Sequence, residues 1–227
     1  MALGRAVAAE SPAEHPRVLV LRDTRESGEM LEAALAAGVT AAGGEVLLGG
    51  VLPTPAAPLL LGRYGFDLAA VISASHNPYR DNGIKFFGPD GFKLSDAREA
   101  AIERRLEEPA GPAPVRIGRV RRLHATLEDY LRELQGRFSG LDLSGVDVCL
   151  DCANGATYQA APEAFRRLGA RVTVVADTPD GRNINAGCGS THVEAFAAAV
   201  AAGGHDLGFA FDGDGDRVLA VDRTGAV

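Results

Sequence analysis

Apolar residues along this chain alternate between short unbroken runs and longer stretches with helical spacing. Short runs bounded by polar turns are typical of buried strands, whereas apolar positions three and four apart indicate one face of a helix. In the first part of the chain the pattern predicts strands at residues 17–21, 45–48, 68–72 and 84–87. It predicts helices between Ser27 and Gly43, from Pro55 to Leu61, after Ser95 and at residues 127–138.

Polar residues at the predicted helix starts are the expected N-terminal caps. Ser27, Thr54 and Ser95 each stand just before a helical pattern, and Pro55 suits a first helical turn. The buried face of the first of these helices is expected to carry these apolar residues: Met30, Leu31, Ala34, Leu35 and Val39.

The second part of the chain repeats the same rhythm. The pattern predicts strands at residues 146–150, 171–175 and 207–211, a return strand at 217–222, and helices at 162–168 and 192–202. Strands that alternate with helices are typical of a parallel α/β fold. We therefore predict two consecutive α/β domains, residues 1–140 and 141–227, with the boundary at Ser139-Gly140.

The last residues lie just past a turn where a further paired strand is expected. An uncovered sheet edge is usually avoided in natural proteins, so we expect this sequence to be part of a longer chain.

Composition narrows the class of protein. The 227 residues carry a formal charge of −7, which leaves no basic surplus for binding nucleic acid. Since no apolar run approaches the ~20 residues that span a bilayer, we expect a cytoplasmic protein with no membrane partner. The three cysteines suit a reducing compartment. Cys149 and Cys152 have the spacing of a redox or zinc motif, but no second pair completes a site, which favours core packing.

A polar loop follows the predicted strand at residues 68–72. Residues 72–85 read ISASHNPYRDNGIK, and a parallel sheet usually presents its ligand at such a strand end. Ser75 is the candidate nucleophile, since a serine hydroxyl reacts when a base, a metal or a phosphoryl group alters it.

An acidic motif follows the strand at residues 207–211. Asp212, Asp214 and Asp216 alternate with glycines that let the backbone turn tightly, so the three carboxylates can converge on one cation. Oxygen ligands favour Mg²⁺ or Ca²⁺ over zinc. An EF-hand is excluded because Arg217 and Arg223 occupy the positions of its glycine and its glutamate. The alternative is a solvated acidic turn, in which the carboxylates would repel one another. Arg217, beside the cluster, is a suitable hydrogen-bond donor to a phosphate group.

Three motifs together resemble the α-D-phosphohexomutase superfamily. They are Ser73-Ala74-Ser75-His76-Asn77-Pro78, Asn82-Gly83-Ile84-Lys85, and the acidic motif with Arg217. The sequence of the serine loop, together with the segments at residues 151–156 and 183–185, is most similar to the bacterial phosphoglucosamine mutase branch of this superfamily.

This resemblance implies a mixed-sheet α/β fold, a phosphoryl group on Ser75, and one Mg²⁺ held by Ser75, Asp212, Asp214 and Asp216. It implies the interconversion of glucosamine 6-phosphate and glucosamine 1-phosphate through a 1,6-bisphosphate. The expected partner is a small sugar phosphate, with a homodimer as a further possibility.

Three other residues of the motifs have open assignments. Lys85 either shuttles a proton, if a cationic neighbourhood lowers its pKa, or supplies a fixed charge that steadies a phosphate. His76 either touches the phosphoryl group or shapes the loop by a hydrogen bond. Asn77 stands beside it as a substrate-binding or phosphate-binding candidate.

The chain also departs from the family pattern. Nothing before Arg17 matches the family's arginine-bearing first loop, and the third and fourth domains are not represented. We therefore expect these 227 residues alone to bind metal without mutase turnover. The alternatives are a phosphomannomutase or phosphoglucomutase, a non-catalytic module that binds Mg²⁺ and phosphate, and a metal-dependent phosphatase.

Overall fold

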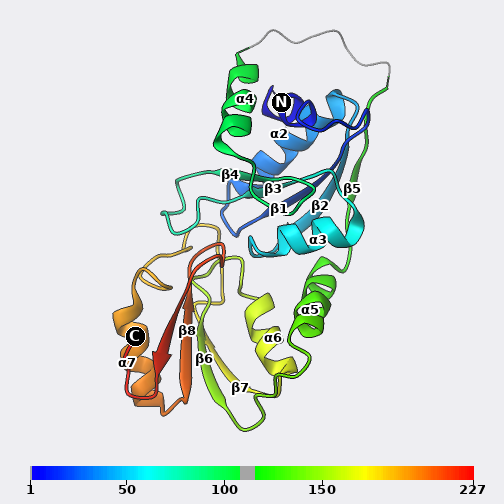
Figure 1. Cartoon of the computed structure of the whole chain (residues 1–227). Coiled ribbons are helices and arrows are strands. Elements are labelled where there is room, and N and C mark those ends of the chain that lie inside the picture. The colour runs from blue at the N-terminus through cyan, green and yellow to red at the C-terminus, as the bar shows by residue number, and fades with distance from the viewer. Residues whose placement is uncertain (1, 108–115) are drawn as a thin grey trace.

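The computed structural model describes residues 2–107 and 116–227 as two α/β domains joined end to end (Figure 1). The first domain contains α1 (Ala2–Ala8), β1 (Arg17–Arg22), α2 (Gly28–Ala41), β2 (Glu45–Val51), α3 (Ala56–Tyr64), β3 (Leu68–Ile72), β4 (Ile84–Phe87), α4 (Asp96–Leu106) and β5 (Val120–Arg122). The second contains β6 (Asp147–Asp151), α6 (Ala160–Arg167), β7 (Arg171–Val175), α7 (Val193–Gly203), β8 (Leu207–Phe211) and β9 (Val218–Asp222). Helix α5 (Thr126–Arg137) lies between them.

Alternation along β1 divides the first core into two layers. Val18 and Val20 face α1, α2 and α4, whereas Leu19 and Leu21 face α3 and α5. All four side chains are fully buried. The run of apolar residues in β1 therefore exists because helices cover both faces of its sheet (Figure 1).

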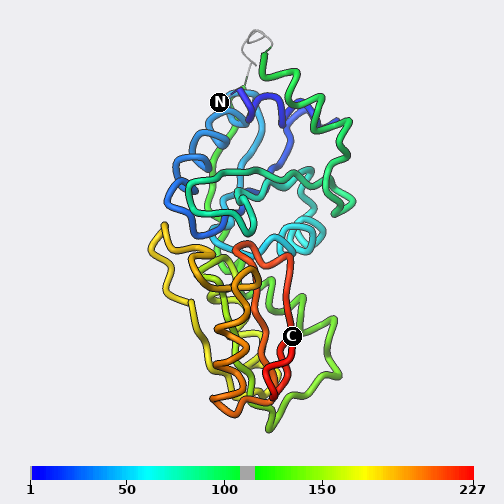
Figure 2. Tube along the Cα trace, turned by 90° about the vertical axis from the view of Figure 1, so that its left-hand side faces the viewer, coloured from blue at the N-terminus to red at the C-terminus, as the bar shows by residue number. Residues whose placement is uncertain are grey.

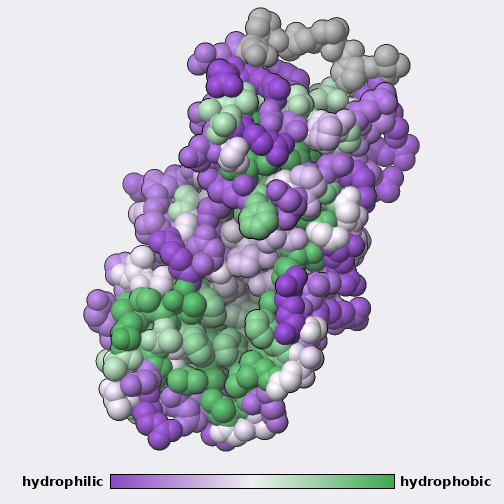
Figure 3. All heavy atoms as spheres, viewed as in Figure 1, coloured by the Kyte–Doolittle hydropathy of each residue, from purple (hydrophilic) through white to green (hydrophobic). Residues whose placement is uncertain are grey.

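In the second sheet, strand β6 is covered on both faces, whereas β7 and β9 are largely exposed. Val148 and Leu150 of β6 pack with residues of α6, whereas Cys149 packs with Phe196 and Val200 of α7. Hydrophobic residues gather over the front of this domain (Figure 3). Val218 and Leu219 of β9 are among the exposed large hydrophobic residues of the chain.

The two sheets share one topology. The first has the order β4-β3-β1-β2-β5 and the second β7-β6-β8-β9. In each, the central strand has parallel neighbours on both sides, and an antiparallel strand follows, β4 beside β3 and β9 beside β8. Strand β1 corresponds to β6, and β3 to β8. Both domains are therefore mixed-sheet α/β units, which confirms the predicted fold class.

Topology also explains why polar loops meet at the domain junction. The strand after β1, which is β2, lies on one side of β1, and the next strand, β3, lies on its other side. Strands β7 and β8 flank β6 in the same way. Such switch points place the loops after the central strands next to each other at the carboxyl ends. The loops after β1 and β3 face those after β6 and β8 across the junction (Figure 2).

The boundaries of most predicted helices and strands agree with the structure within one to three residues. The apolar pattern did not indicate α1 or β5. Strand β5 has only three residues, all exposed, so it carries no apolar signal. Met30 was expected on the buried face of α2 but is 65% exposed; Leu35 and Val39 are buried.

The three expected caps are wrong in detail. The hydroxyls of Ser27 and Ser95 make no capping hydrogen bond, and Pro55 rather than Thr54 precedes α3. Ser27 Oγ donates instead to Asn82 Oδ1 (2.5 Å), and Thr54 Oγ1 donates to Asp214 Oδ2 (2.5 Å). Ser27 and Ser95 thus stand at the predicted N-cap positions, and the hydroxyls of Ser27 and Thr54 make tertiary contacts in place of local caps.

The expected environment of the cysteine pair is confirmed. Cys149 and Cys152 are buried and unbridged, and burial raises the pKa of Cys152 to about 12. Among the described helices, none is long and apolar enough to span a membrane.

Candidate active site

The serine loop, residues 73–83 between β3 and β4, holds Ser75 in an unusual backbone conformation. Ser75 has φ 53°, in the left-handed region that costs a residue with a side chain about 1–3 kcal/mol. Its amide donates to Ser73 Oγ (3.0 Å), and Ser73 Oγ donates to Asp23 Oδ2 (2.7 Å). The turn aims the Ser75 hydroxyl across the domain junction, where it donates to Asp212 Oδ2 (2.6 Å).

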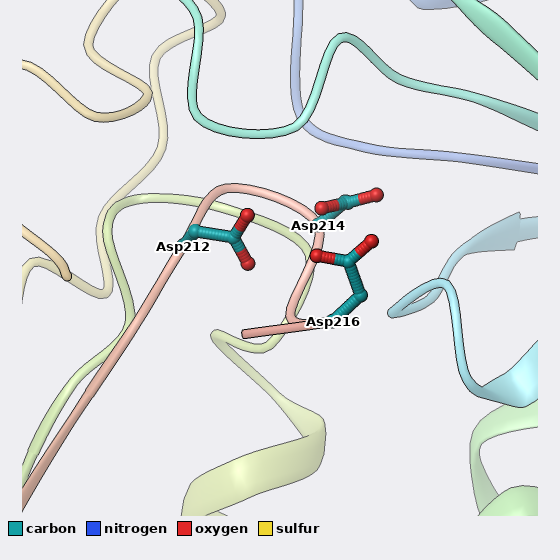
Figure 4. Close-up of side chains that lie close together, drawn as sticks. All are labelled: Asp212, Asp214 and Asp216. Atoms are coloured by element: carbon teal, nitrogen blue, oxygen red, sulfur yellow. The ribbon is translucent and has the colours of Figure 1, made fainter. Parts of the chain in front are cut away.

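The aspartate loop, residues 212–217 between β8 and β9, brings its three carboxylates together (Figure 4). One oxygen from each of Asp212, Asp214 and Asp216 lies within 4.8 Å of the others. Gly215 has φ 67°, and a Cβ at Gly213 would lie 2.6 Å from the Ser75 carbonyl. The predicted convergence is therefore confirmed, and the glycines permit both the turn and the contact between the loops.

Crowded and buried carboxylates make this loop an unfavourable place for negative charge. Burial, helped by the charges of Asp214 and Asp216, raises the pKa of Asp212 above its ordinary value. Burial acts in the same direction on Asp214, but hydrogen bonds from Lys85 and Thr54 outweigh it, so the pKa of Asp214 is lowered. The cluster is therefore stabilised by positive charge placed beside it.

A divalent cation fits this cluster. Asp214 Oδ1 is buried and has no hydrogen-bond partner among the described residues. A buried carboxylate oxygen without a donor is costly, and a metal ion would satisfy it. The three carboxylates and Ser75 Oγ offer oxygen ligands only, the set that hard ions such as Mg²⁺ prefer. The donor set matches the predicted metal site.

Lys85 of β4 occupies a different environment from the one that a proton shuttle requires. Its Nζ donates to Asp214 Oδ2 (2.7 Å) and Asp216 Oδ2 (2.9 Å). Burial alone would lower the pKa of Lys85, but the two carboxylates outweigh it and raise that pKa. The cationic neighbourhood considered from the sequence is wrong in this structure, and Lys85 is held as an ammonium.

Arg217 links the serine to the aspartates. Its Nη2 donates to Ser75 Oγ (2.6 Å) and to Asp212 Oδ2 (2.9 Å), and it lies 2.5 Å from His76 Nδ1. Its side chain is half exposed, so the guanidinium can also reach a ligand in solvent. The structure therefore places Arg217 and His76 beside the serine hydroxyl.

Asn77 takes part mainly through its backbone. Its side-chain amide donates to Asp81 Oδ2 (3.0 Å) within the serine loop, while its carbonyl accepts from Arg25 and Asn185. The side chain of Asn77 is thus engaged within its own loop.

Three residues that border the site had not been selected from the sequence as site residues: Arg25, Thr54 and Asn185. Arg25 was detectable, because Asp23-Thr24-Arg25 directly follows β1 at the carboxyl edge of the sheet. Thr54 resembled an ordinary helix cap. Asn185 reaches the serine loop from the other domain, a contact that no local pattern encodes.

A serine hydroxyl, three convergent carboxylates, a lysine and an arginine lie together at the junction of two α/β domains, an arrangement that suits a protein of the phosphoryl-transfer class. The particular family follows from comparison. Residues 1–111 match the model for "Phosphoglucomutase/phosphomannomutase, alpha/beta/alpha domain I", and residues 128–225 match that for domain II. The chain belongs to this family, within the phosphohexomutases.

Curated relatives support the same assignment. The chain is 51% identical over 230 residues to the phosphoglucosamine mutase of Deinococcus radiodurans, covering 99% of this chain and 51% of that protein. It is 54% identical over 212 residues to one from Cereibacter sphaeroides, covering 92% and 47%. The chain thus spans about half the length of the curated relatives it matches.

Solved structures show the same fold. A phosphoglucomutase/phosphomannomutase family protein from Burkholderia thailandensis superposes with a TM-score of 0.82 at 29% identity, covering 99% of this chain and 50% of that one. A Thermus thermophilus structure described as a putative phosphomannomutase also gives 0.82, at 24% identity, covering 99% and 53%. Its low identity supports the fold alone.

Proposed function

We propose that this chain carries the phosphoserine and metal sites of a phosphoglucosamine mutase, which interconverts glucosamine 6-phosphate and glucosamine 1-phosphate. The single observation that carries the proposal is the contact of Ser75 Oγ with Asp212 Oδ2 at 2.6 Å across the domain junction. It joins the candidate phosphoryl carrier of one domain to the candidate metal site of the other.

The reaction is a reversible exchange of one phosphoryl group. The bond from phosphorus to Ser75 Oγ breaks as a new bond forms to the free sugar hydroxyl, which yields a 1,6-bisphosphate. Overall the hydroxyl proton of the sugar is replaced by the phosphoryl group, and Ser75 regains a hydroxyl proton. Return of the other phosphate to Ser75 leaves the isomeric monophosphate.

Residues around Ser75 suit a transition state whose charge is spread over phosphoryl oxygens. Arg217 Nη2, 2.6 Å from Ser75 Oγ, can donate to the leaving serine oxygen. Lys85 adds a fixed positive charge at Asp214 and Asp216. His76, which contacts Arg217, orients that guanidinium.

Mg²⁺ held by Ser75 and the three aspartates would neutralise phosphoryl charge when bound. The structural support for these ligands is the convergence of their oxygens and the unpartnered Asp214 Oδ1 among the described residues. The oxygen-only donor set favours Mg²⁺ over zinc.

Glucosamine phosphate is the preferred substrate because the relatives at 51–54% identity bear the name phosphoglucosamine mutase. The test is to incubate the chain and Mg²⁺ with the 1,6-bisphosphate of glucosamine, glucose or mannose, and to measure intact mass over hours. We expect one added phosphate on Ser75, acquired fastest from the glucosamine compound. Ser75→Ala should acquire none and should stay folded, with its melting temperature lowered only by the loss of one hydrogen bond to Asp212.

Other outcomes would reject specific parts of the proposal. Faster phosphorylation by the mannose or glucose compound would assign a different hexose. A phosphate located on an aspartate would indicate a phosphatase-type reaction. No added phosphate from any of the three donors would leave a module that binds metal without transferring phosphate.

A further inference from the structure

Two backbone carbonyls of the serine loop are each held from both domains. Arg25 Nη2 of the first domain donates to the carbonyl oxygens of Ser75 (3.2 Å) and Asn77 (2.9 Å). Asn185 Nδ2 of the second domain donates to the same two oxygens, at 2.9 Å and 3.1 Å. Arg25 Nη1 also donates to the carbonyl of Pro78. The backbone on both sides of His76 is thus fixed by side-chain donors.

Arg25 is itself held rigidly. Its Nε donates to Asp23 Oδ2 (2.8 Å), and its backbone amide donates to Asp23 Oδ1 (3.0 Å). The side chains of both residues are only 1% exposed. Asp23 Oδ2 also accepts a hydrogen bond from Ser73 Oγ, which in turn accepts one from the Ser75 backbone amide. One buried ion pair therefore supports the first half of the serine loop, from Ser73 to Pro78.

Asn185 reaches the loop from an equally constrained position. It is buried, has φ 58°, and its backbone amide donates to the carbonyl of Ala153 (2.9 Å). A Cβ at Gly213 would lie 2.7 Å from Asn185 Nδ2, so the aspartate loop packs directly against this amide. The same side chain therefore contacts both the serine loop and the loop of the candidate metal ligands.

The left-handed conformation of Ser75 needs such support. Residues with side chains adopt it only where the surroundings hold them there. A flip of the peptide after Ser75 would turn its carbonyl away from both donors and would release the loop that carries the hydroxyl in contact with Asp212. Two hydrogen bonds to the Ser75 carbonyl, one from each side chain, oppose that flip directly, and the two to the Asn77 carbonyl hold the next part of the loop.

We propose that Arg25 and Asn185 are positioning residues that form a carbonyl clamp on Ser75 and Asn77, and that phosphoryl transfer at Ser75 depends on this clamp. The inference rests on the proposed function for its catalytic part and on geometry alone for its conformational part. Neither side chain contacts Ser75 Oγ or a carboxylate of the cluster within the described hydrogen bonds, so both act through the loop backbone.

The alternative is that these residues merely join the domains. Other contacts do so as well, including Thr24 Oγ1 to the Asn154 carbonyl (2.6 Å) and Arg182 to Glu26 (2.7 Å). A residue that only joins domains would affect stability without changing the local dynamics of residues 73–77. The experiment therefore measures local hydrogen exchange and phosphorylation in one set of variants.

Asn185→Ala is the main variant, and Asn183→Ala is its matched control. Asn183 belongs to the same loop, but its amide donates to Thr178 (3.0 Å) within the second domain. Arg25→Lys keeps the charge and loses the fork of donors that reaches three carbonyls. Since the ion pair of Arg25 is buried, this variant can unfold, and Asn185→Ala then decides the question alone.

We expect amides of residues 73–77 to exchange at least about 10-fold faster in Asn185→Ala than in the unmodified chain, while those of α2 keep their protection. Phosphorylation of Ser75 by glucosamine 1,6-bisphosphate should slow by roughly 10- to 100-fold, since misplacement by about 1 Å has that effect. Asn183→Ala should stay within about threefold on both measures by the same reasoning.

Two results would overturn the clamp. Unchanged exchange at residues 73–77 in Asn185→Ala would show that Asn185 does not hold the loop. Faster exchange there with an unchanged phosphorylation rate would show that the loop need not be held for transfer. If the unmodified chain accepts no phosphate, the proposed function fails, whereas the exchange measurement still decides whether the clamp exists.

Discussion

Lys85 has the position that a cation would take in the aspartate cluster. Its ammonium bonds two of the three carboxylates, and Arg217 bonds the third. The protein therefore supplies its own counterions to the cluster. A divalent ion that binds Asp214 and Asp216 competes with Lys85 for the negative charge of the same two carboxylates, so the strength of metal binding reports on this lysine.

Replacement of Lys85 by methionine should reveal this competition. Without metal, Lys85→Met should lower the free energy of unfolding by about 1.5–3 kcal/mol, the range for hydrogen bonds to charged groups. Millimolar Mg²⁺ should then raise the melting temperature of the variant more than that of the unmodified chain, because the ion no longer displaces an ammonium. Thermal unfolding with and without Mg²⁺ measures both effects.

Lys93→Met is the matched control for this substitution. Lys93 pairs with Glu99 (3.0 Å) but is 52% exposed, and exposed pairs contribute about 1 kcal/mol or less. Equal destabilisation by the two variants, or an identical Mg²⁺ shift in Lys85→Met and the unmodified chain, would contradict the argument.

Single residues also mark how far the sequence could predict the site. Ser75 and the three aspartates were found because a strand end and glycine spacing identify them locally. Thr54, Arg25 and Asn185 were not selected, since their partners lie 160, 50 and 110 residues away. The environment of Lys85 was misjudged for the same reason: two carboxylates 129 and 131 residues further along determine it.

At the scale of elements, two loops of equivalent topological position form the site. The serine loop joins β3 to β4, and the aspartate loop joins β8 to β9. The positions of most strands along the chain were predictable because short apolar runs mark them, whereas the strand order within each sheet was not predicted. The close approach of the two loops was not predictable from the sequence, because it depends on the absence of a side chain at Gly213 and on the packing of the two domains.

A methyl group at Gly213 should separate these loops. In Gly213→Ala the new Cβ would lie 2.6 Å from the Ser75 carbonyl and 2.8 Å from Ile184 Cδ1, so the backbone has to move. We expect about 1–3 kcal/mol of destabilisation and at least about a 10-fold loss of Mg²⁺ affinity, since a ligand shell is sensitive to small displacements. Calorimetric titration with Mg²⁺ measures the second effect.

Gly62→Ala is the control, and it should stabilise the chain where Gly213→Ala destabilises it. Gly62 lies within α3 with open space around its Cβ position, so alanine should stabilise by about 0.5–1 kcal/mol. Unaltered Mg²⁺ affinity in Gly213→Ala would show that the two loops tolerate separation.

At the scale of the whole molecule, α5 belongs to both domains. Tyr130 packs into the core cluster beneath the first sheet, although residues 128–225 match the model for the second domain. Glu133 pairs with Arg63 of α3 (2.9 Å), and Glu128 pairs with Arg167 of α6 (2.7 Å). Unfolding of either domain therefore disturbs a helix that the other uses.

Tyr130 should make global stability dependent on alkaline pH. Burial raises its pKa from 10.0 to about 12, so the native state holds the phenolic proton more tightly than the unfolded state does. The contribution of this proton to the free energy of unfolding is fully present below pH 10 and is lost as the pH rises toward 12. Two pKa units correspond to about 2.7 kcal/mol.

Tyr130→Phe keeps the ring and removes the titration. The unmodified chain should lose up to about 2–3 kcal/mol relative to this variant between pH 9.5 and pH 12, roughly the range of the shift. Urea unfolding across that interval gives the difference, in which titration of Tyr64 and the lysines cancels. Parallel pH profiles for the two proteins would show that Tyr130 ionises without cost to the fold.

The antiparallel strand that closes each parallel run has a consequence for protein engineering. A loop that connects antiparallel neighbours leaves and re-enters the sheet at adjacent strand ends, so one pair of strands fixes both of its ends. The serine loop and the aspartate loop are thus cassettes at equivalent places in two similar sheets, each held at its ends by strands and along its length by side chains such as Asn185 and Thr54. A redesigned active site could replace either cassette and keep both cores, provided that the small residue at the point of contact is preserved.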